Sequence, residues 1–456
     1  MHDTTIDVHE ELASAPVGRM HVTLGIVLAL LTLFDGYDTF NPAYVIHYVR
    51  VPWGLSLQQA GMLVSSGLVG FLVGAAVHGV LADRFGRRIT LIVGLWTTTV
   101  FSILTALFAD SFVSFCTLRI LTGLGLGVLL PLSTTYINEL APRRVANTFA
   151  LWGVALGWAS GGAAAGIVGV LVTPHTGWQG LYWVGSLSLL LIPFVHRYLP
   201  ESPKFALLRG NDAQVKSILA KLRPERAKAY SRYPIGRPAT DTRTSVLALL
   251  DKPYRKLSIA IWTTSFLSLF CIFGLSGWIP TLMQARGESF GASFAFGASM
   301  QITSFIGALV CGHLVDRFQH PRHWLCAWSV GGAASVLALI LFHSHWVNLI
   351  CSAMAGFCII GGQFVLNNFT AASYETRMRA TAVGMELAVG RLGAILGPFI
   401  GGALQQLFGG SGAMLAAICM AAAGAAVSVL FATKTTGLGP NDAGATEHTA
   451  INIAHG

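Results

Sequence analysis

The sequence predicts an all-α membrane protein with twelve transmembrane helices in two pseudo-symmetric six-helix bundles. Of its 456 residues, 54% are hydrophobic and only 11% are charged, about half the charged fraction of a soluble domain. Its apolar runs are long enough to cross ~30 Å of hydrocarbon at ~1.5 Å per residue. A charged segment, GVLADRFGRR at 79–88, returns in shorter form as GHLVDRF at 312–318, which indicates a duplicated half.

The two copies of this segment must each form a turn at a membrane face, because a cluster of fixed charges cannot lie in hydrocarbon. A looser repetition follows at a similar offset, with ELAPRR at 139–144 and ETRMR at 375–379. Two similar offsets support the duplication.

The apolar runs set the division of the chain. They begin near residues 21, 60, 89, 113, 146 and 178, and again near 256, 293, 324, 346, 380 and 411. We therefore expect an N-terminal tail (1–20), a first bundle (21–198), a linker (199–254), a second bundle (255–433) and a C-terminal tail (434–456). Within the linker, residues 216–223 could form a short amphipathic helix on the membrane surface.

The basic residues predict the orientation in the membrane. Arg50 and Arg286 are the only bases in the loops assigned to the outside, and Arg119 and Arg391 lie within helices. The positive-inside rule then places both termini in the cytoplasm, with the chain crossing the inner (plasma) membrane many times. The first residues lack the basic flank of a signal peptide, so we expect the first helix to be retained. The net charge of +9 reflects this orientation and contact with anionic lipids, and does not indicate nucleic-acid binding.

We expect no metal and no cofactor. The seven cysteines lie in or beside apolar runs without metal or disulfide spacing, as buried small hydrophobes do. The histidine pairs in short loops, at 320 and 323 and at 343 and 345, lack a third ligand at suitable spacing.

Several motifs carry a resemblance to a known family. Residues 79–88 match, without a gap, the G-x-L-x-D-R-x-G-R-R loop between helices 2 and 3 of the major facilitator superfamily. Within that superfamily, the chain resembles the aromatic acid:proton symporter family. The resemblance covers both halves of the chain. The segments are DGYD (35–38), RILTGLGLG (119–127), LPESP (199–203), WIPTLM (278–283), RATAVG (379–384) and GRLGAILG (390–397).

The resemblance implies the major facilitator fold and import of benzoate-like, hydroxybenzoate-like or phenylpropionate-like anions with protons. Two departures stand out. The second turn continues FQHP from Phe318 in place of Gly-Arg-Arg, which predicts weaker contacts there than in the first turn. Pro42, in the NPAY that follows the first acidic motif, is not part of the family pattern and bears on the substrate.

Two acids lie deep in the first helix. Asp35 is about 14 residues from its start and Asp38 is one turn further, so we expect both to face one cavity. An ionised carboxylate facing lipid would cost several kcal/mol, which makes an acid at this depth a functional hypothesis. We assign both to proton coupling. A structural ion pair, or acceptance of backbone hydrogen bonds, is the alternative for either one.

Two arginines are the candidates for binding a substrate anion. Arg119 lies at a depth similar to that of Asp35, and proton uptake by a paired acid would release its guanidinium for a substrate. Arg391 lies near the bilayer middle, where its planar guanidinium suits a carboxylate. Glu386, five residues before it, should point about 140° away. Permanent salt bridges are the alternative for both arginines.

Uncharged residues complete the expected substrate site. Polar side chains that could bind ring hydroxyls, or join helices instead, are Gln301, Gln363, Asn367 and Asn368. Tyr37 and Trp158 are the aromatic candidates for stacking on a ring, with ordinary core packing as the alternative.

A further set of charges lies too near the cytoplasmic face to meet a substrate midway. We expect them to act in gating, by pairing in one conformation and separating in the other; fixing the topology alone is the alternative. They are Asp83, Arg84, Arg87, Arg88, Glu139, Arg143, Asp316, Arg317, Glu375 and Arg379.

These observations predict a secondary active transporter that imports an aromatic carboxylate by proton symport through alternating access. The partners would be the anion, the proton and membrane lipids, with the protein acting as a monomer. An enzyme is not expected, since the sequence has no G-x-S-x-G and no H-E-x-x-H. The alternatives are a proton-coupled transporter of another organic anion, an efflux antiporter, and a non-transporting membrane sensor.

Overall fold

The computed structural model describes residues 5–142, 144–236 and 245–433. Within these ranges, twelve helices are long and apolar enough to cross a membrane. The predicted starts agree with the observed spans to within about three residues. The only extended pairing within the same ranges is one isolated bridge between Ile6 and Ile235, so the all-α prediction is confirmed.

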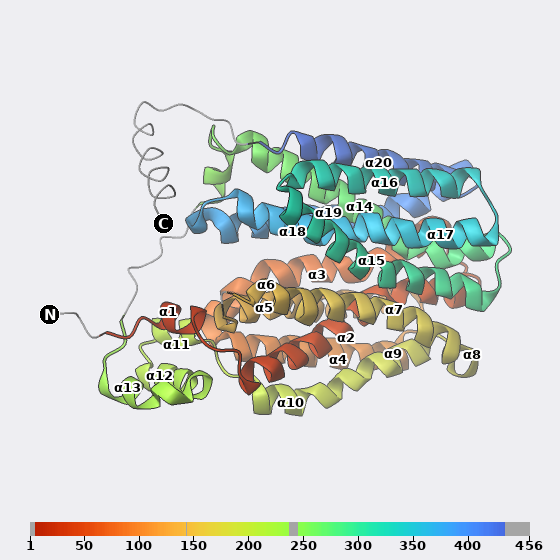
Figure 1. Ribbon diagram of the computed structural model, residues 1–456. Helices are drawn as coiled ribbons and strands as arrows, with labels where there is room; N and C mark the ends of the chain where they lie inside the picture. Colours follow the sequence, from red (N-terminus) through yellow and green to blue (C-terminus); the bar gives the residue numbers. More distant parts are fainter. Residues whose placement is uncertain (1–4, 143, 237–244, 434–456) are drawn as a thin grey trace.

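The helices form two bundles that lie side by side (Figure 1). The first contains α2 (Arg19–Val49), α3 (Leu57–Phe85), α4 (Arg87–Phe108), α5 (Phe112–Leu140), α6 (Ala146–Ala150), η1 (Leu151–Ala155), α7 (Leu156–Leu171), α8 (Thr173–Thr176), α9 (Gln179–Gly185), η2 (Ser186–Leu190) and α10 (Leu191–Tyr198). The second contains α14 (Arg255–Ala285), α15 (Phe290–Phe318), α16 (Pro321–Leu341), α17 (His345–Ala355), η5 (Gly356–Ile360), α18 (Gly361–Ser373), α19 (Thr376–Phe408) and α20 (Gly412–Leu430). Between and before them lie α1 (Val8–Ala13), α11 (Pro203–Leu208), α12 (Asp212–Leu222), η3 (Pro224–Arg226), α13 (Ala227–Arg232) and η4 (Val246–Leu250).

Glycines bring neighbouring helices into backbone contact where the candidate site lies. A Cβ on Gly36 of α2 would lie 2.1 Å from the carbonyl oxygen of Trp158 in α7. In the second bundle, a Cβ on Gly393 of α19 would lie 2.0 Å from the carbonyl oxygen of Phe266 in α14. Such close packing, typical of membrane helices, fixes the helices that carry Asp35 and Arg391.

The two bundles contact each other at the end that carries the loop of residues 50–56, which we call the loop end. There the Ser65 hydroxyl donates to the Ile395 carbonyl at 2.7 Å, and the Gln58 amide donates to the Gln406 side chain at 3.2 Å. The rings of Tyr44 and Phe294 also pack with centroids 4.8 Å apart. The halves are therefore closed together at the loop end.

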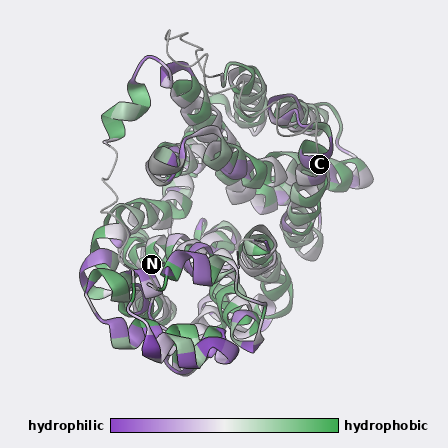
Figure 2. Ribbon diagram, turned by 60° about the vertical axis from the view of Figure 1, so that its left-hand side comes forward, coloured by the Kyte–Doolittle hydropathy of each residue, from purple (hydrophilic) through white to green (hydrophobic). Residues whose placement is uncertain are grey.

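The opposite end, at which α2 begins and α20 ends, we call the termini end. Figure 2, which brings this end forward, shows hydrophilic residues gathered on the first bundle there. Several of them belong to a small unit in which α1 packs with α12 and α13 (Figure 1).

This unit corrects the expectation of an amphipathic helix on the membrane surface. The apolar side of α12, including Val215 and Leu219, is fully buried in a core that also contains Val8 and Leu12 from the N-terminal segment. Glu11 accepts hydrogen bonds from Arg223 and Tyr230, both at 2.8 Å, and pairs with Arg226 at 2.6 Å. The predicted helix is present as α12, but protein, rather than lipid, covers its apolar face.

Candidate functional site

Asp35 lies in the middle of α2 and is fully buried. Neither of its carboxylate oxygens has a hydrogen bond of standard geometry, and the side chain of Trp158 comes near enough only for a weak one. Arg391, from the other half, attracts it electrostatically. A buried carboxylate without a hydrogen bond of standard geometry is costly to keep ionised, so this position favours a group that exchanges a proton.

Asp38 is also fully buried but has different neighbours. Its Oδ1 accepts a hydrogen bond from Asn41 at 3.3 Å, and a Cβ on Gly185 of α9 would lie 2.7 Å from that same oxygen. The cation that attracts it is Arg119, in its own half. The two acids, which we expected to face one cavity, thus have different arginines and different surroundings.

Arg119 approaches Asp38 without forming an ion pair. Its Nη2 donates to the main-chain oxygen of Asp38 at 2.7 Å, and its guanidinium lies 5.7 Å from the centroid of the Tyr182 ring. Its Nε and Nη1 have no hydrogen-bond partner although the residue is 1% exposed. Two buried donors therefore remain available inside the first bundle.

Tyr37 lies in the same core. It is 1% exposed, and its hydroxyl donates to the main-chain oxygen of Leu181 at 2.9 Å. This geometry supports the packing alternative for Tyr37 rather than a ring-stacking role.

Arg391 of α19 lies at the interface between the halves. Its guanidinium carbon is 3.7 Å from the centroid of the Phe71 ring in α3 and 5.9 Å from that of Phe273 in α14. This stacking is a cation–π contact. Both Asp35 and Glu386 attract the guanidinium electrostatically, but no described residue accepts a hydrogen bond from it. The Phe71 ring thus holds the planar face of the guanidinium, whereas the N–H donors of Arg391 remain available for a carboxylate.

Aromatic side chains from both halves surround this region. The Phe40 ring packs edge-on to Trp158, with centroids 4.9 Å apart, and lies parallel to Phe273 at 5.9 Å. Trp158 in turn packs edge-on to Phe364 of α18, with ring centroids 6.1 Å apart. Of these, only Trp158 is among the candidates predicted from the sequence. Phe40 follows Asp38 closely and Phe364 follows Gln363, so closeness in sequence to a candidate polar residue was the available signal.

The candidate amides of the second half fall into two places. Gln301 of α15, 2% exposed, packs against Gly162 of α7, and its Oε1 has no hydrogen-bond partner. Gln363 and Asn367 belong to a polar cluster around Glu386. Asn368 is exposed and lies outside that cluster.

Glu386 is a buried acid that is not among the site residues predicted from the sequence. It is fully buried, and its Oε1 accepts hydrogen bonds from the Ser265 hydroxyl at 2.6 Å and from Gln363 Nε2 at 3.1 Å. It also attracts Arg391, despite the angle expected between them on the helix. Its position in a membrane helix was itself a signal.

The charged turn of the first half forms a connected network. Arg87 pairs with Asp83 at 3.1 Å and with Glu139 at 3.7 Å. Glu201, in the LPESP segment, accepts hydrogen bonds from the backbone amides of Arg87 at 2.9 Å and Arg88 at 3.2 Å. A carboxylate at these first residues of α4 satisfies donors that the helix leaves open. Glu201 is a member of the network that the sequence analysis missed.

Two further side chains tie this network together. The Ser202 hydroxyl donates to Glu139, and the Arg209 guanidinium donates to the main-chain oxygen of Arg84. Gly86, between α3 and α4, has a φ of 102°, which favours glycine. Of the predicted gating charges of the first half, Asp83, Arg87 and Glu139 are thus brought together by their side chains.

The turn of the second half has fewer contacts. Asp316 and Arg317 are exposed, and neither forms an ion pair with another described side chain. Gln319, at a φ of 56°, replaces the glycine. The expectation of weaker contacts is confirmed for the side chains that the structure describes. Glu375 accepts a hydrogen bond from Tyr254 and Arg379 is exposed, whereas Arg143 lies outside the described residues.

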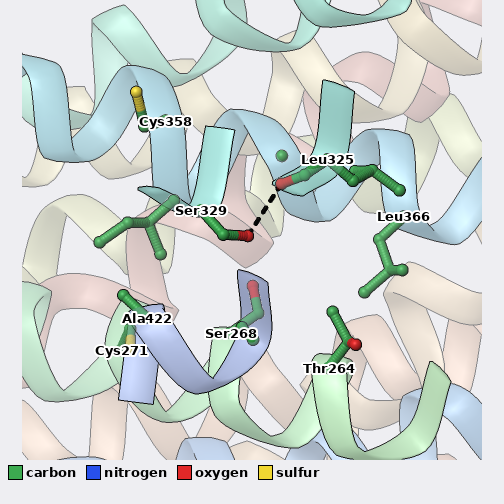
Figure 3. A pocket seen from close by; sticks show the side chains of 11 residues that line it. Thr264, Ser268, Cys271, Leu325, Ser329, Cys358, Leu366 and Ala422 are labelled. Atoms are coloured by element: carbon green, nitrogen blue, oxygen red, sulfur yellow. Dashed lines mark hydrogen bonds between the residues drawn. The ribbon is translucent and has the colours of Figure 1, made fainter. Parts of the chain in front are cut away.

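A small cavity inside the second bundle is separate from these groups (Figure 3). It measures about 20 Å³, and Ser329, which lines it, donates to the Leu325 carbonyl at 2.9 Å. This is room for about one water molecule, and no charged residue lines it. Across the described residues, no three side chains are grouped as a metal site. We therefore place the candidate site around Arg391 and Asp35.

Comparison with known proteins gives relatives that match along nearly the whole chain. The gallate transporter of Pseudomonas putida is 32% identical, over 94% of this chain and 95% of its own. The 3-(3-hydroxy-phenyl)propionate transporter of Escherichia coli is 31% identical, over 92% and 96%. The 4-hydroxybenzoate transporter PcaK of Pseudomonas aeruginosa is 29% identical, over 93% and 95%. These relatives confirm the resemblance to the aromatic acid transporters.

Solved structures agree on the fold. The partially occluded inward-open form of the xylose transporter XylE from Escherichia coli superposes with a TM-score of 0.71 at 18% identity, covering 90% of this chain and 98% of that one. The sequence profile of the Major Facilitator Superfamily matches residues 26–331 and 292–453. With its twelve spans, its duplicated bundles and these relatives, which are transporters and not enzymes, the chain belongs to the Major Facilitator Superfamily.

Proposed function

We propose that this protein imports an aromatic carboxylate together with a proton, by alternating access. The observation that carries the proposal is Arg391. It is 7% exposed, rests on Phe71 of the opposite half, and donates no hydrogen bond to a described residue. A guanidinium in this position favours an anion, and a carboxylate can accept two parallel hydrogen bonds from it.

The surrounding side chains favour an aromatic ring on that carboxylate. Phe40 and Trp158 of the first half face Phe273 and Phe364 of the second. Rings in offset or edge-on contact with a bound ring add stabilisation beyond the buried area. The names of the relatives, which include gallate and 4-hydroxybenzoate transporters, support the same substrate class.

Asp35 is the proposed carrier of the coupled proton. In the ionised form it attracts Arg391 across the interface; in the protonated form this attraction is lost, and the guanidinium is left for the substrate anion. Because the proton and the anion bind to opposing halves, loading both neutralises the interface before the halves rock. Asp38, beside Arg119, would tune Asp35 rather than carry a second proton.

The proposed setting is the inner membrane, with the termini end in the cytoplasm. The excess of basic residues in the loops and tails of that end supports it. Closure of the halves at the loop end then corresponds to closure toward the outside, the state from which a substrate would leave inward.

The test is uptake by the purified protein in proteoliposomes under an inwardly directed proton gradient. A panel of labelled benzoates, cinnamates, phenylpropionates and heteroaromatic acids should give saturable, gradient-dependent accumulation for at least one aromatic carboxylate. Counterflow without a gradient separates a transporter from a sensor. The proposal is wrong if no aromatic acid is taken up, or if an acidic exterior drives export.

A further inference from the structure

Arg391 is attracted by two carboxylates that belong to different halves. Asp35 attracts it from α2 in the first half, and Glu386 attracts it from α19, the helix that carries Arg391 itself. Neither acid is within 4.0 Å of the guanidinium as an ion pair. The arginine is therefore shared between the two charges without being bound to either.

Glu386 is hydrogen-bonded by neighbours in its own half. The Ser265 hydroxyl of α14 donates to its Oε1 at 2.6 Å, and Gln363 Nε2 of α18 donates to the same oxygen at 3.1 Å. A Cβ on Gly390 would lie 2.5 Å from the Ser265 oxygen, so this glycine allows α14 and α19 to approach closely enough for the first bond. The carboxylate is fixed in position by two other helices.

Rocking of the halves would change these two attractions differently. Asp35 and the Phe71 ring are in the first half and would move away from Arg391, whereas Glu386, Ser265 and Gln363 would move with it. A buried guanidinium that loses its only opposite charge is strongly destabilised. Glu386 provides a compensating charge that is present in both states.

We propose that Glu386 is a positioning residue that keeps Arg391 compensated in both states and weakens its hold on the substrate anion, so that the anion can leave. This inference rests on the proposed function. Its negative charge lowers the attraction between Arg391 and a carboxylate, and its hydrogen bonds to Ser265 and Gln363 stop it from displacing that carboxylate. Release, as well as binding, then depends on the second half.

Two substitutions with opposite expected effects test the proposal. Glu386→Gln removes the charge and keeps an oxygen for Ser265, so it should lower the Kd of 4-hydroxybenzoate by about tenfold and slow net uptake. Ser265→Ala keeps the charge but frees the carboxylate to approach Arg391, so it should raise that Kd severalfold. Glu288→Gln, which removes an acid paired with His345 at 2.7 Å, is the matched control and should change neither value.

The neutral analogue 4-hydroxybenzamide serves as the second probe. It has the same ring but no charge, so its Kd should stay within about twofold in both variants if the effect passes through the charge of Arg391. A merely structural role for Glu386 would weaken binding of both probes in both variants and would overturn the inference. The inference would also be overturned if Glu386→Gln kept the wild-type Kd and uptake rate. It would likewise be overturned if this variant lost only uphill uptake, because Glu386 would then be a proton carrier.

Failure of the proposed function gives a different result. Wild-type protein would then bind none of the aromatic carboxylates in the panel, before any variant is made. If Glu386→Gln does not reach the membrane, the raised Kd expected for Ser265→Ala still decides the question.

Discussion

The two halves share one architecture but surround their buried acids differently. In the first half, atoms without a hydrogen-bond partner include both oxygens of Asp35, Oδ2 of Asp38, and Nε and Nη1 of Arg119. In the second half, the buried acid Glu386 accepts hydrogen bonds from two other helices. An unsatisfied buried charge is costly and persists where something else must bind. This difference agrees with the proposal that the coupled proton is carried in the first half, by Asp35, and the anion is bound in the second half, by Arg391.

The charged turns also differ between the halves, but here the first half has the more extensive hydrogen bonds and ion pairs. In the first half, the turn is tied down by Glu139 and Glu201 at the start of α4, whereas Asp316 and Arg317 in the second half are exposed. The half with the unsatisfied centre therefore has the better-anchored end. We interpret the anchored turn as support for a bundle core in which buried charged groups lack hydrogen-bond partners.

The largest expected effect is at Asp35. Asp35→Asn should abolish uphill uptake driven by a pH gradient and leave the exchange of internal for external substrate largely intact, because exchange needs no net deprotonation. Both rates are measured with labelled substrate in proteoliposomes. Uphill accumulation that persists in this variant would move the coupling to Asp38 or Glu386.

The next effect is at Arg391. Arg391→Lys keeps the charge but loses the planar, two-pronged geometry, which should cost roughly 1.5 to 3 kcal/mol, or about one to two decades in Kd. Equilibrium binding to purified protein measures it. A lysine variant of native affinity would show that Arg391 serves packing or gating instead.

A smaller effect should separate the two turns. Glu201→Ala removes the acceptor for two amides at the start of α4 and should lower the free energy of unfolding by about 1 to 2 kcal/mol. Asp316→Ala, at the exposed counterpart, should change it by less than about 0.5 kcal/mol. Thermal unfolding in detergent measures both variants. Equal shifts would mean that the anchoring of the first turn is not the source of the difference.

The smallest expected effect is that of the membrane potential. One proton carried with one monovalent carboxylate moves no net charge, so a valinomycin potassium potential at equal pH should drive little uptake. Two protons would move one charge, worth ~2.3 kcal/mol per 100 mV. Strong accumulation under potential alone would exclude the one-proton scheme and assign a second proton to Asp38 or Glu386.

The sequence by itself determined the fold, and it predicts the orientation of the spans. Hydrocarbon admits only helices whose backbone is internally bonded, so twelve apolar runs and a duplicated charged turn were enough to predict two bundles. Asp35 and Arg391 could also be singled out, since charge at membrane depth is rare. The turn near Phe318, which lacks the Gly-Arg-Arg ending, correctly predicted an asymmetry between the halves.

Only the tertiary structure decided which groups face each other. Helical spacing relates residues on one helix, but gives no account of which side of a helix faces its own bundle and which faces the other half. That is why Asp35 and Asp38, one turn apart, have different arginines, why Glu386 influences Arg391 despite its angle, and why α12 packs on α1 rather than on lipid. Each of these outcomes depends on contacts between residues far apart in the chain, which the packing of whole helices brings together.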